Sequence, residues 1–354
     1  KLIMNFETTP SSNNSLYDSE DSDFDDFLNK GKPTSLSSFQ TTALFILSVV
    51  LVLGVPGNAL VVWITTCDMK RSVNTVWFLN LAIADLLCCL SVSFTIMEIV
   101  MGQWPLGLAT CKLIPTLLLI NMYASVLLLT VISIDRWLLV AKPVWCQNKR
   151  TVIKAYLACA TVWLLALILT SPSFVFRQIV VNIVEKHVCV MHYNISKDHI
   201  EKVKQFIAIF RFLIGFIIPF VVITVCYGVL VRKVSERYNK SGKTMKVVTV
   251  VIIGFFVCWF PYHIAGLIIA THSSNSDLYQ NTLKIDPILV SFAIINSCIN
   301  PIIYVLAGQD LKSKFRKSIR SVVKNVLAEE ESQSFDSKKT KSSSETKNTD
   351  TFGV

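Results

Sequence analysis

Seven long apolar stretches constrain this chain more than any other feature of its sequence. Each can cross the roughly 30 Å hydrocarbon core of a bilayer as a helix, for which about 20 apolar residues suffice. Backbone groups in lipid must bond within a helix or a closed barrel, and the strand-length alternation of a barrel is missing from this sequence. The stretches lie near residues 43–66, 75–101, 111–134, 152–176, 206–231, 246–270 and 287–307. The sequence therefore predicts an all-α membrane protein, a bundle of seven transmembrane helices.

The charges between these stretches predict the orientation of the chain. Basic residues gather after the first, third and fifth stretches and in residues 312–324, whereas the charged residues among the first 33 are mostly acidic. Because basic loops stay in the cytoplasm, we expect an extracellular N-terminus and a cytoplasmic C-terminus. The basic residues flank the membrane, which argues against a nucleic-acid partner.

Four regions follow from this pattern. Residues 1–37 form an acidic tail that we expect to be disordered, and residues 38–308 form the transmembrane domain. Residues 309–324 predict a short amphipathic eighth helix, whose basic face suits an anionic lipid leaflet. Residues 325–354 predict a disordered tail rich in Ser and Thr, where phosphorylation would add negative charge.

The outer side offers candidate modification and docking residues. Asn13 and Asn194 begin Asn-x-Ser sequons and are candidate glycosylation sites. Tyr17 lies among acidic residues, a setting that permits sulfation, although a plain solvated tail explains it equally well. Together the tail predicts a landing surface for a cationic partner, made of Tyr17, Asp18, Glu20, Asp21, Asp23, Asp25 and Asp26.

Two of the ten cysteines differ from the rest in their expected location. Cys111 and Cys189 fall on the extracellular, oxidising side, and they predict a disulfide between the third helix and the loop after the fourth. Most of the others lie inside apolar stretches, where cysteine acts as a small apolar residue. The five histidines lack the spacing of a zinc site.

Polar residues in mid-membrane predict a buried polar site. A carboxyl group at the depth of Asp85 must be protonated, paired or bound to a cation. Oxygen-bearing side chains on other helices lie at comparable depth, and such ligands suit a small cation such as sodium. A water-filled hydrogen-bond network without an ion is the alternative. The candidate sodium ligands are Asp85, Asn121, Ser125, Asn296 and Ser297.

Charged residues near the outer helix ends predict a pocket. Arg177, Arg211 and Asp286, with His263 close to them, lie in or beside apolar stretches, where an unpaired charge is costly. One interpretation is an Arg–Asp bridge that closes the bundle. The other, which we favour, is a pocket whose two guanidinium groups bind a ligand carboxylate while Asp286 binds a cation. A peptide that ends in arginine has both charges on its last residue.

Patterns on all seven stretches resemble one known family. They are Gly57-Asn58, Leu81-Ala82-Ile83-Ala84-Asp85, Asp135-Arg136-Trp137, Trp163, Pro219 with Tyr227, Cys258-Trp259-Phe260-Pro261 and Asn300-Pro301-Ile302-Ile303-Tyr304. The chain is similar to rhodopsin-like G-protein-coupled receptors. The segments WFLNLAIADLLCCLS, INMYASVLLLTVISIDR, KPVWCQN and NPIIYVLAGQD resemble complement anaphylatoxin receptors.

The resemblance implies a chemoattractant receptor of the plasma membrane, active in inflammation and chemotaxis, and not an enzyme. The expected ligand is a cationic anaphylatoxin peptide, with component 5a favoured over component 3a or a formyl-peptide-like chemoattractant. The expected cytoplasmic partners are an inhibitory-type heterotrimeric G protein, arrestin and receptor kinases. A decoy receptor is less favoured, because the non-signalling relative lacks the arginine present here as Arg136. A transporter and an intramembrane enzyme are disfavoured by the lack of an internal repeat and of catalytic motifs in the sequence.

Roles for single residues also follow from the resemblance. Arg136 would leave Asp135 to meet the G protein, and Tyr262 would join the residues that receive the ligand's terminal arginine. Trp137 departs from the family's usual tyrosine. The implied ligand-binding residues are Arg177, Arg211, Tyr262, His263 and Asp286. The implied switch and coupling residues are Asp135, Arg136, Trp137, Tyr227, Phe255, Trp259, Pro261, Asn300, Pro301 and Tyr304.

Overall fold

A computed structural model describes residues 36–181, 185–193, 197–237 and 243–307. The backbone alone is described at residues 197–198, 231, 233–237, 243–248 and 302–307. The proposed eighth helix at 309–324 and the two tails lie outside the described residues.

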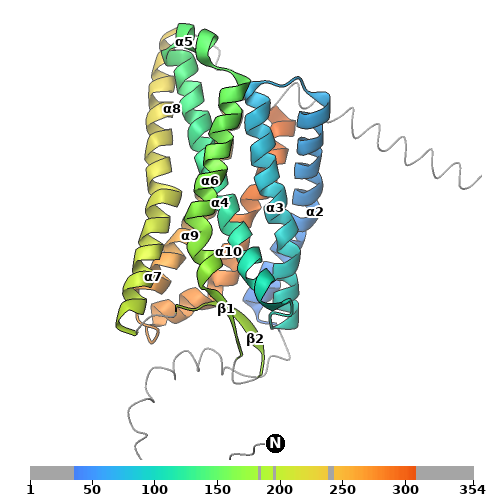
Figure 1. Ribbon diagram of the computed structural model, residues 1–354, viewed down its shortest axis with the longest axis vertical. Coiled ribbons are helices and arrows are strands. Elements are labelled where there is room, and N and C mark those ends of the chain that lie inside the picture. Colours follow the sequence, from blue (N-terminus) through green and yellow to red (C-terminus); the bar gives the residue numbers. More distant parts are fainter. Residues whose placement is uncertain (1–35, 182–184, 194–196, 238–242, 308–354) are drawn as a thin grey trace, which may run out of the picture.

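Seven spans among the described residues are long and apolar enough to cross a membrane, which confirms the predicted bundle (Figure 1). Six of them rest on α2 (Ser38–Trp63), α3 (Val73–Met101), α4 (Gly107–Ala141), α6 (Val152–Phe176), α9 (Lys243–Thr271) and α10 (Asp277–Ala307). The other joins α7 (Lys197–Phe212), the π-helical turn η2 (Leu213–Ile217) and α8 (Ile218–Arg237). A second such turn, η1 (Ile64–Asp68), extends α2.

The third span, α4, is the most enclosed of the seven. In its most apolar part 61% of the residues are buried, compared with 22–39% in the other spans. It packs against α3, α6 and α8, and the main apolar core gathers around it. Large apolar side chains on the outer faces of the other helices are exposed, as expected for surfaces that meet lipid.

A β-hairpin corrects the expectation that every element is a helix. Strand β1 (Arg177–Val181) pairs antiparallel with β2 (His187–Met191) directly after α6. Both strands contain β-branched residues, and outside the lipid two strands can satisfy each other's backbone groups. Arg177 therefore begins a strand and does not end a helix. A short helix, α5 (Pro143–Lys149), lies in the loop after α4 and begins with proline at its first position.

Two helices begin earlier than their apolar stretches predict. α10 begins at Asp277 and not near 287, which places Asp286 more than two turns inside it. α7 begins at Lys197, so Arg211 lies nearly four turns inside that helix. The apolar stretch marks only the part of a helix that contacts lipid, whereas the hydrogen-bonded helix continues beyond it. Both charged residues thus lie on continuous helices.

Candidate ligand pocket and coupling site

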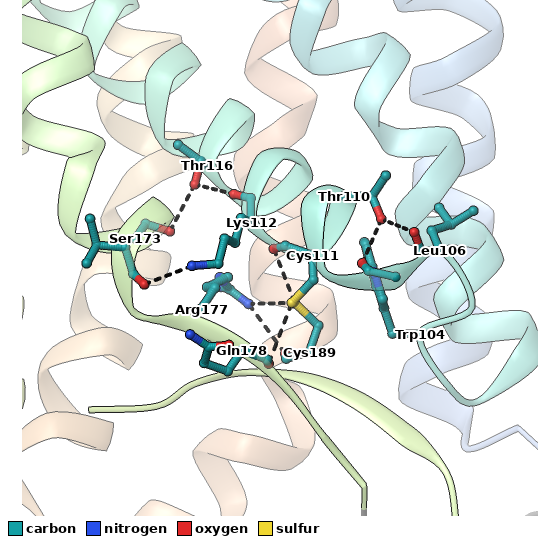
Figure 2. The surroundings of a disulfide bond; sticks show 12 residues. Trp104, Leu106, Thr110, Cys111, Lys112, Thr116, Ser173, Arg177, Gln178 and Cys189 are labelled. Carbon is teal, nitrogen blue, oxygen red and sulfur yellow. Dashed lines mark hydrogen bonds between the residues drawn. A yellow bond between two sulfur atoms is a disulfide. The ribbon is translucent and has the colours of Figure 1, made fainter. Parts of the chain in front are cut away.

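The predicted disulfide between Cys111 and Cys189 joins α4 to strand β2, with the two Cα atoms 5.6 Å apart (Figure 2). Trp104, 2% exposed, packs beside it. The Trp104 backbone N–H also donates to the carbonyl of His187, at 2.7 Å. The hairpin is therefore fixed at two points, the disulfide to α4 and the bond to Trp104, and it fixes Arg177 at its first position.

The Arg177 side chain extends toward the disulfide (Figure 2), and its Nη1 donates to the Cys189 carbonyl at 3.5 Å. Its Nε atom is buried and has no hydrogen-bond partner. Burial lowers the pKa of the Arg177 guanidinium, and Tyr262 and Glu98 oppose this effect. Arg177 thus keeps an unused donor in a partly desolvated place, where an unmade hydrogen bond is costly.

Arg211 lies against the inner face of α9. Its Nη1 donates to the Tyr262 hydroxyl at 3.2 Å, and its Cζ atom lies 5.1 Å from the centre of the Tyr262 ring. The guanidinium packs directly on Gly266, where any Cβ atom would collide with Nη2. The Nε atom of Arg211 is also buried without a partner. α9 therefore sets the direction of this arginine and leaves one of its donors unused.

His263 and Asp286 complete the set of predicted pocket residues. His263 is 1% exposed among the rings of Phe212 and Phe216, and neither of its ring nitrogens has a hydrogen-bond partner. Asp286 has an electrostatic interaction with Arg211. Among the described residues, Asp286 forms no ion pair with either arginine, so the alternative of an Arg–Asp bridge is wrong for this structure.

Three residues that interact with these arginines were missed from the sequence. Glu98 of α3 and Tyr193 have electrostatic interactions with Arg177, and Tyr123 of α4 has one with Arg211. Burial raises the pKa of Tyr193, whose ring centre lies 5.0 Å from that of Phe176. Glu98 could have been found, because a carboxylate in an apolar stretch is a functional signal. The tyrosines give no such signal, because apolar packing also explains them.

A chain of aromatic rings leads from this pocket toward the middle of α9. The ring centres of Tyr262 and Trp259 are 5.5 Å apart, and those of Trp259 and Phe255 are 6.0 Å apart. Trp259 and Phe255 are completely buried, and Pro261 lies within the helix beside them. Because these rings are close-packed, Tyr262 cannot move far without displacing Trp259.

The predicted polar site forms around Asp85, which is fully buried. Asn300 Nδ2 donates to Asp85 Oδ2 at 2.6 Å. With the Asn121 amide oriented to satisfy its neighbours, its nitrogen donates to Asp85 Oδ1 at 3.2 Å and its oxygen accepts from Ser297 Oγ at 3.1 Å. Ser125 lies beside Asn121 on α4. The structure thus brings these residues together from three helices.

This donor set fits a small cation. It combines one carboxylate with amide and hydroxyl oxygens, which are the hard ligands such an ion prefers. Asn296 is 1% exposed and neither atom of its amide has a partner, and the Asn300 amide oxygen is also buried without one. The same unpaired atoms would also suit buried water molecules, as in the alternative of a water-filled hydrogen-bond network.

The C-terminal end of α4 differs from the expected pairing of Asp135 with Arg136. Asp135 forms an ion pair with Arg150, Oδ1 to Nε, at 2.7 Å. Arg136 instead donates through Nη2 to Asn74 Oδ1 at 2.7 Å. Tyr227 of α8 has an electrostatic interaction with Arg136.

The remaining predicted residues lie within helices or outside the described residues. Trp137 is partly buried at the end of α4. Pro301 lies within α10 and packs near Gly57 of α2. The side chain of Tyr304 lies outside the described residues, as do Asn13, Asn194, Tyr17, Asp18, Glu20, Asp21, Asp23, Asp25 and Asp26.

Comparison with known proteins places this geometry in context. Residues 57–304 match the model of the family "7 transmembrane receptor (rhodopsin family)". The C5a anaphylatoxin chemotactic receptor 1 of Cavia porcellus is 46% identical over 300 residues, covering 83% of this chain and 85% of the relative. The Homo sapiens receptor of the same name has the same identity and coverage. The C3a anaphylatoxin chemotactic receptor of Oncorhynchus mykiss is 42% identical over 317 residues, covering 87% and 86%.

Proposed function

This chain belongs to the rhodopsin family of seven-transmembrane receptors, in its complement anaphylatoxin receptor group, and on that premise we propose that it is a cell-surface chemoattractant receptor for an anaphylatoxin. We favour the C5a anaphylatoxin as its ligand. Receptors of this family are not enzymes, so ligand binding must produce a conformational change. The chain crosses the plasma membrane seven times, with its N-terminus outside and its C-terminus in the cytoplasm.

The observation that carries this proposal is a set of neighbouring charged groups whose hydrogen-bonding capacity is only partly used. Arg177 and Arg211 each keep a buried Nε atom without a partner, and Asp286 is not paired with either arginine. A guanidinium group suits a ligand carboxylate and Asp286 suits a ligand cation. A protein that ends in arginine offers both on one residue. The acidic residues of 1–37 would attract the cationic body of such a ligand.

Binding would be transmitted through α9. Tyr262 accepts a hydrogen bond from Arg211 and packs on Trp259. A ligand that moves this arginine would therefore also displace the packed aromatic rings of α9. Pro261 removes one backbone hydrogen bond and gives α9 a hinge. Movement at this hinge would open a cytoplasmic cleft beside Arg136 for an inhibitory-type heterotrimeric G protein. Receptor kinases and arrestin would then act on the Ser- and Thr-rich C-terminal tail.

The polar site would regulate this movement. A bound sodium ion would supply a positive charge that neutralises the Asp85 carboxylate. Asn300 already donates to that carboxylate, so the ion and Asn300 would compete for it. The residues that would hold the ion are Asp85, Asn121, Ser125, Asn296 and Ser297.

The terminal-arginine model is tested by pairing receptor and ligand truncations. Arg211→Ala and Asp286→Ala should each weaken the response to intact C5a by about tenfold, the scale of one lost charge-assisted hydrogen bond. The same substitutions should have little effect on the response to C5a without its last arginine. Equal losses with both ligands would contradict the model.

A receptor for the C3a anaphylatoxin is the second candidate, favoured by the 42% identity to the Oncorhynchus mykiss protein. Guanine-nucleotide exchange measured with purified C5a and C3a side by side separates the two. A stronger response to C3a would replace our first choice. Binding of either ligand without nucleotide exchange would instead indicate a decoy receptor.

A further inference from the structure

An ion pair between Arg150 and Asp135 lies at the end of the bundle that we propose to be cytoplasmic. Arg150, in the turn between α5 and α6, donates two parallel hydrogen bonds to Asp135. They run from Nε to Oδ1 at 2.7 Å and from Nη2 to Oδ2 at 2.9 Å. Their side chains are 22% and 11% exposed. Both carboxylate oxygens are therefore used by a residue that the sequence patterns did not single out.

Asn74, near the start of α3, connects this pair to Arg136. Its side-chain oxygen accepts from Arg136 Nη2 at 2.7 Å and from Arg150 Nη2 at 2.8 Å. Two guanidinium groups thus meet at one amide oxygen. Like charges this close repel each other, and the Asp135 carboxylate beside them offsets that repulsion. The four side chains form one cluster that ties α3, α4 and the α5–α6 turn together.

The cluster decides which arginine holds the Asp135 carboxylate. Asp135 and Arg136 are consecutive residues of a helix, so their side chains point in different directions. Arg150 approaches from another element and binds the carboxylate in a bidentate manner, which is stronger than a single hydrogen bond. While Arg150 occupies Asp135, Arg136 donates its hydrogen bond to the neutral Asn74 side chain, and Asp135 acts on Arg136 only through a longer-range electrostatic attraction.

We propose that Arg150 is a positioning residue for G-protein coupling, which captures Asp135 and so leaves Arg136 available to the G protein. This inference rests on the function proposed above. Loss of Arg150 frees the Asp135 carboxylate to turn toward Arg136, which then meets the G protein less readily. Arg150 also contacts Asn74, but the proposed effect acts through the Asp135 carboxylate, so it must disappear when that residue carries no charge.

The test measures guanine-nucleotide exchange by an inhibitory-type G protein in membranes that contain the full chain, stimulated with C5a. Arg150→Gln should lower the stimulated rate about three- to fivefold, the scale of a partly exposed ion pair. C5a binding without G protein should not change. Arg150→Lys keeps the charge but loses the pair of parallel hydrogen bonds, so its stimulated rate should lie between those of wild type and Arg150→Gln. Lys149→Gln, an exposed neighbour, is the matched control and should behave as wild type.

The deciding comparison is the double variant Asp135→Asn with Arg150→Gln, which should match Asp135→Asn alone. A loss from Arg150→Gln that persists in the Asp135→Asn background overturns the proposal, as does an unchanged or raised rate in Arg150→Gln. If Arg150→Gln does not reach the cell surface, Arg150→Lys takes its place in the same cycle. A wild-type chain that responds to neither C5a nor C3a would overturn the proposed function instead.

Discussion

Arg211 depends on α9 for its direction, and the contacts that hold it differ in strength. Its hydrogen bond to the Tyr262 hydroxyl involves a charged donor and stabilises this arrangement by about 1.5–3 kcal/mol. The attraction between its guanidinium and the Tyr262 ring adds about 0.5–2 kcal/mol. Both contacts require the guanidinium to lie where Gly266 has no side chain. Gly266 therefore determines where the Arg211 guanidinium can lie.

We predict that Gly266→Ala weakens the C5a response by about tenfold, because the new methyl group displaces the Arg211 guanidinium from Tyr262. The double variant with Arg211→Ala should be no worse than Arg211→Ala alone, because the methyl group acts only through that arginine. Concentration–response curves for nucleotide exchange measure both effects.

Gly254→Ala is the matched control on the same helix. A Cβ atom at Gly254 would lie 3.5 Å from Ile299, an ordinary contact distance. The control should therefore respond as wild type. Equal losses from the two substitutions would indicate a general effect on α9 and would contradict the role assigned to Gly266.

At the scale of elements, the β-hairpin acts as a unit with α4. The disulfide and the Trp104 hydrogen bond fix β2, and backbone pairing then fixes β1 with Arg177 at its first position. Because a disulfide needs both partners, the two cysteines must act together. Their loss should affect the candidate ligand pocket more than the cluster around Asp135 at the other end of α4.

We predict that Cys189→Ser lowers C5a affinity about tenfold or more, because the hairpin no longer holds Arg177 in place, and lowers stability by about 2–4 kcal/mol. Cys111→Ser should have the same effect, and the double variant should lose no more than either single one. Radioligand binding and thermal inactivation measure the two quantities. Cys67→Ser, at an exposed free cysteine, should change neither. Additive losses would contradict a shared disulfide.

Elements differ in how far the sequence predicts them. The spans follow from apolar length alone, because a helix in lipid has few alternatives. The hairpin was missed because its short strands follow α6 without a break, and pairing between residues distant in sequence sets it. The early start of α10 was missed because its first turns are too polar for an apolar stretch.

At the scale of the whole molecule, α4 connects the candidate ligand pocket to the candidate coupling site. Cys111 and Arg136 lie about 37 Å apart along it at about 1.5 Å per residue. The residue types of both sites were predictable, because charge in an apolar stretch is costly and marks function. Their partners were not. Asp135 pairs with Arg150 and not with Arg136, and Glu98 interacts with Arg177. Both partnerships depend on how separate elements pack.

The polar site between these ends yields a prediction for the whole receptor. Asn300 from α10 and a sodium ion would compete for the Asp85 carboxylate, so the ion should favour the arrangement without that hydrogen bond. If C5a favours the arrangement in which Asn300 donates to Asp85, sodium and C5a must each lower the affinity for the other by the same factor. Replacing potassium by sodium at constant ionic strength should lower C5a affinity by about fivefold, the low end of such coupling.

Asp85→Asn should abolish this sodium effect, because a neutral amide does not attract the ion, whereas potassium should give equal affinity in both proteins. Asn296→Ala should reduce the effect in part, because Asn296 offers a buried oxygen without a partner. Ser93→Ala, at an exposed serine of the same helix α3, is the control and should keep the full effect. An Asp85→Asn receptor that stays as sensitive to sodium as wild type would leave the water-filled network as the explanation for these residues.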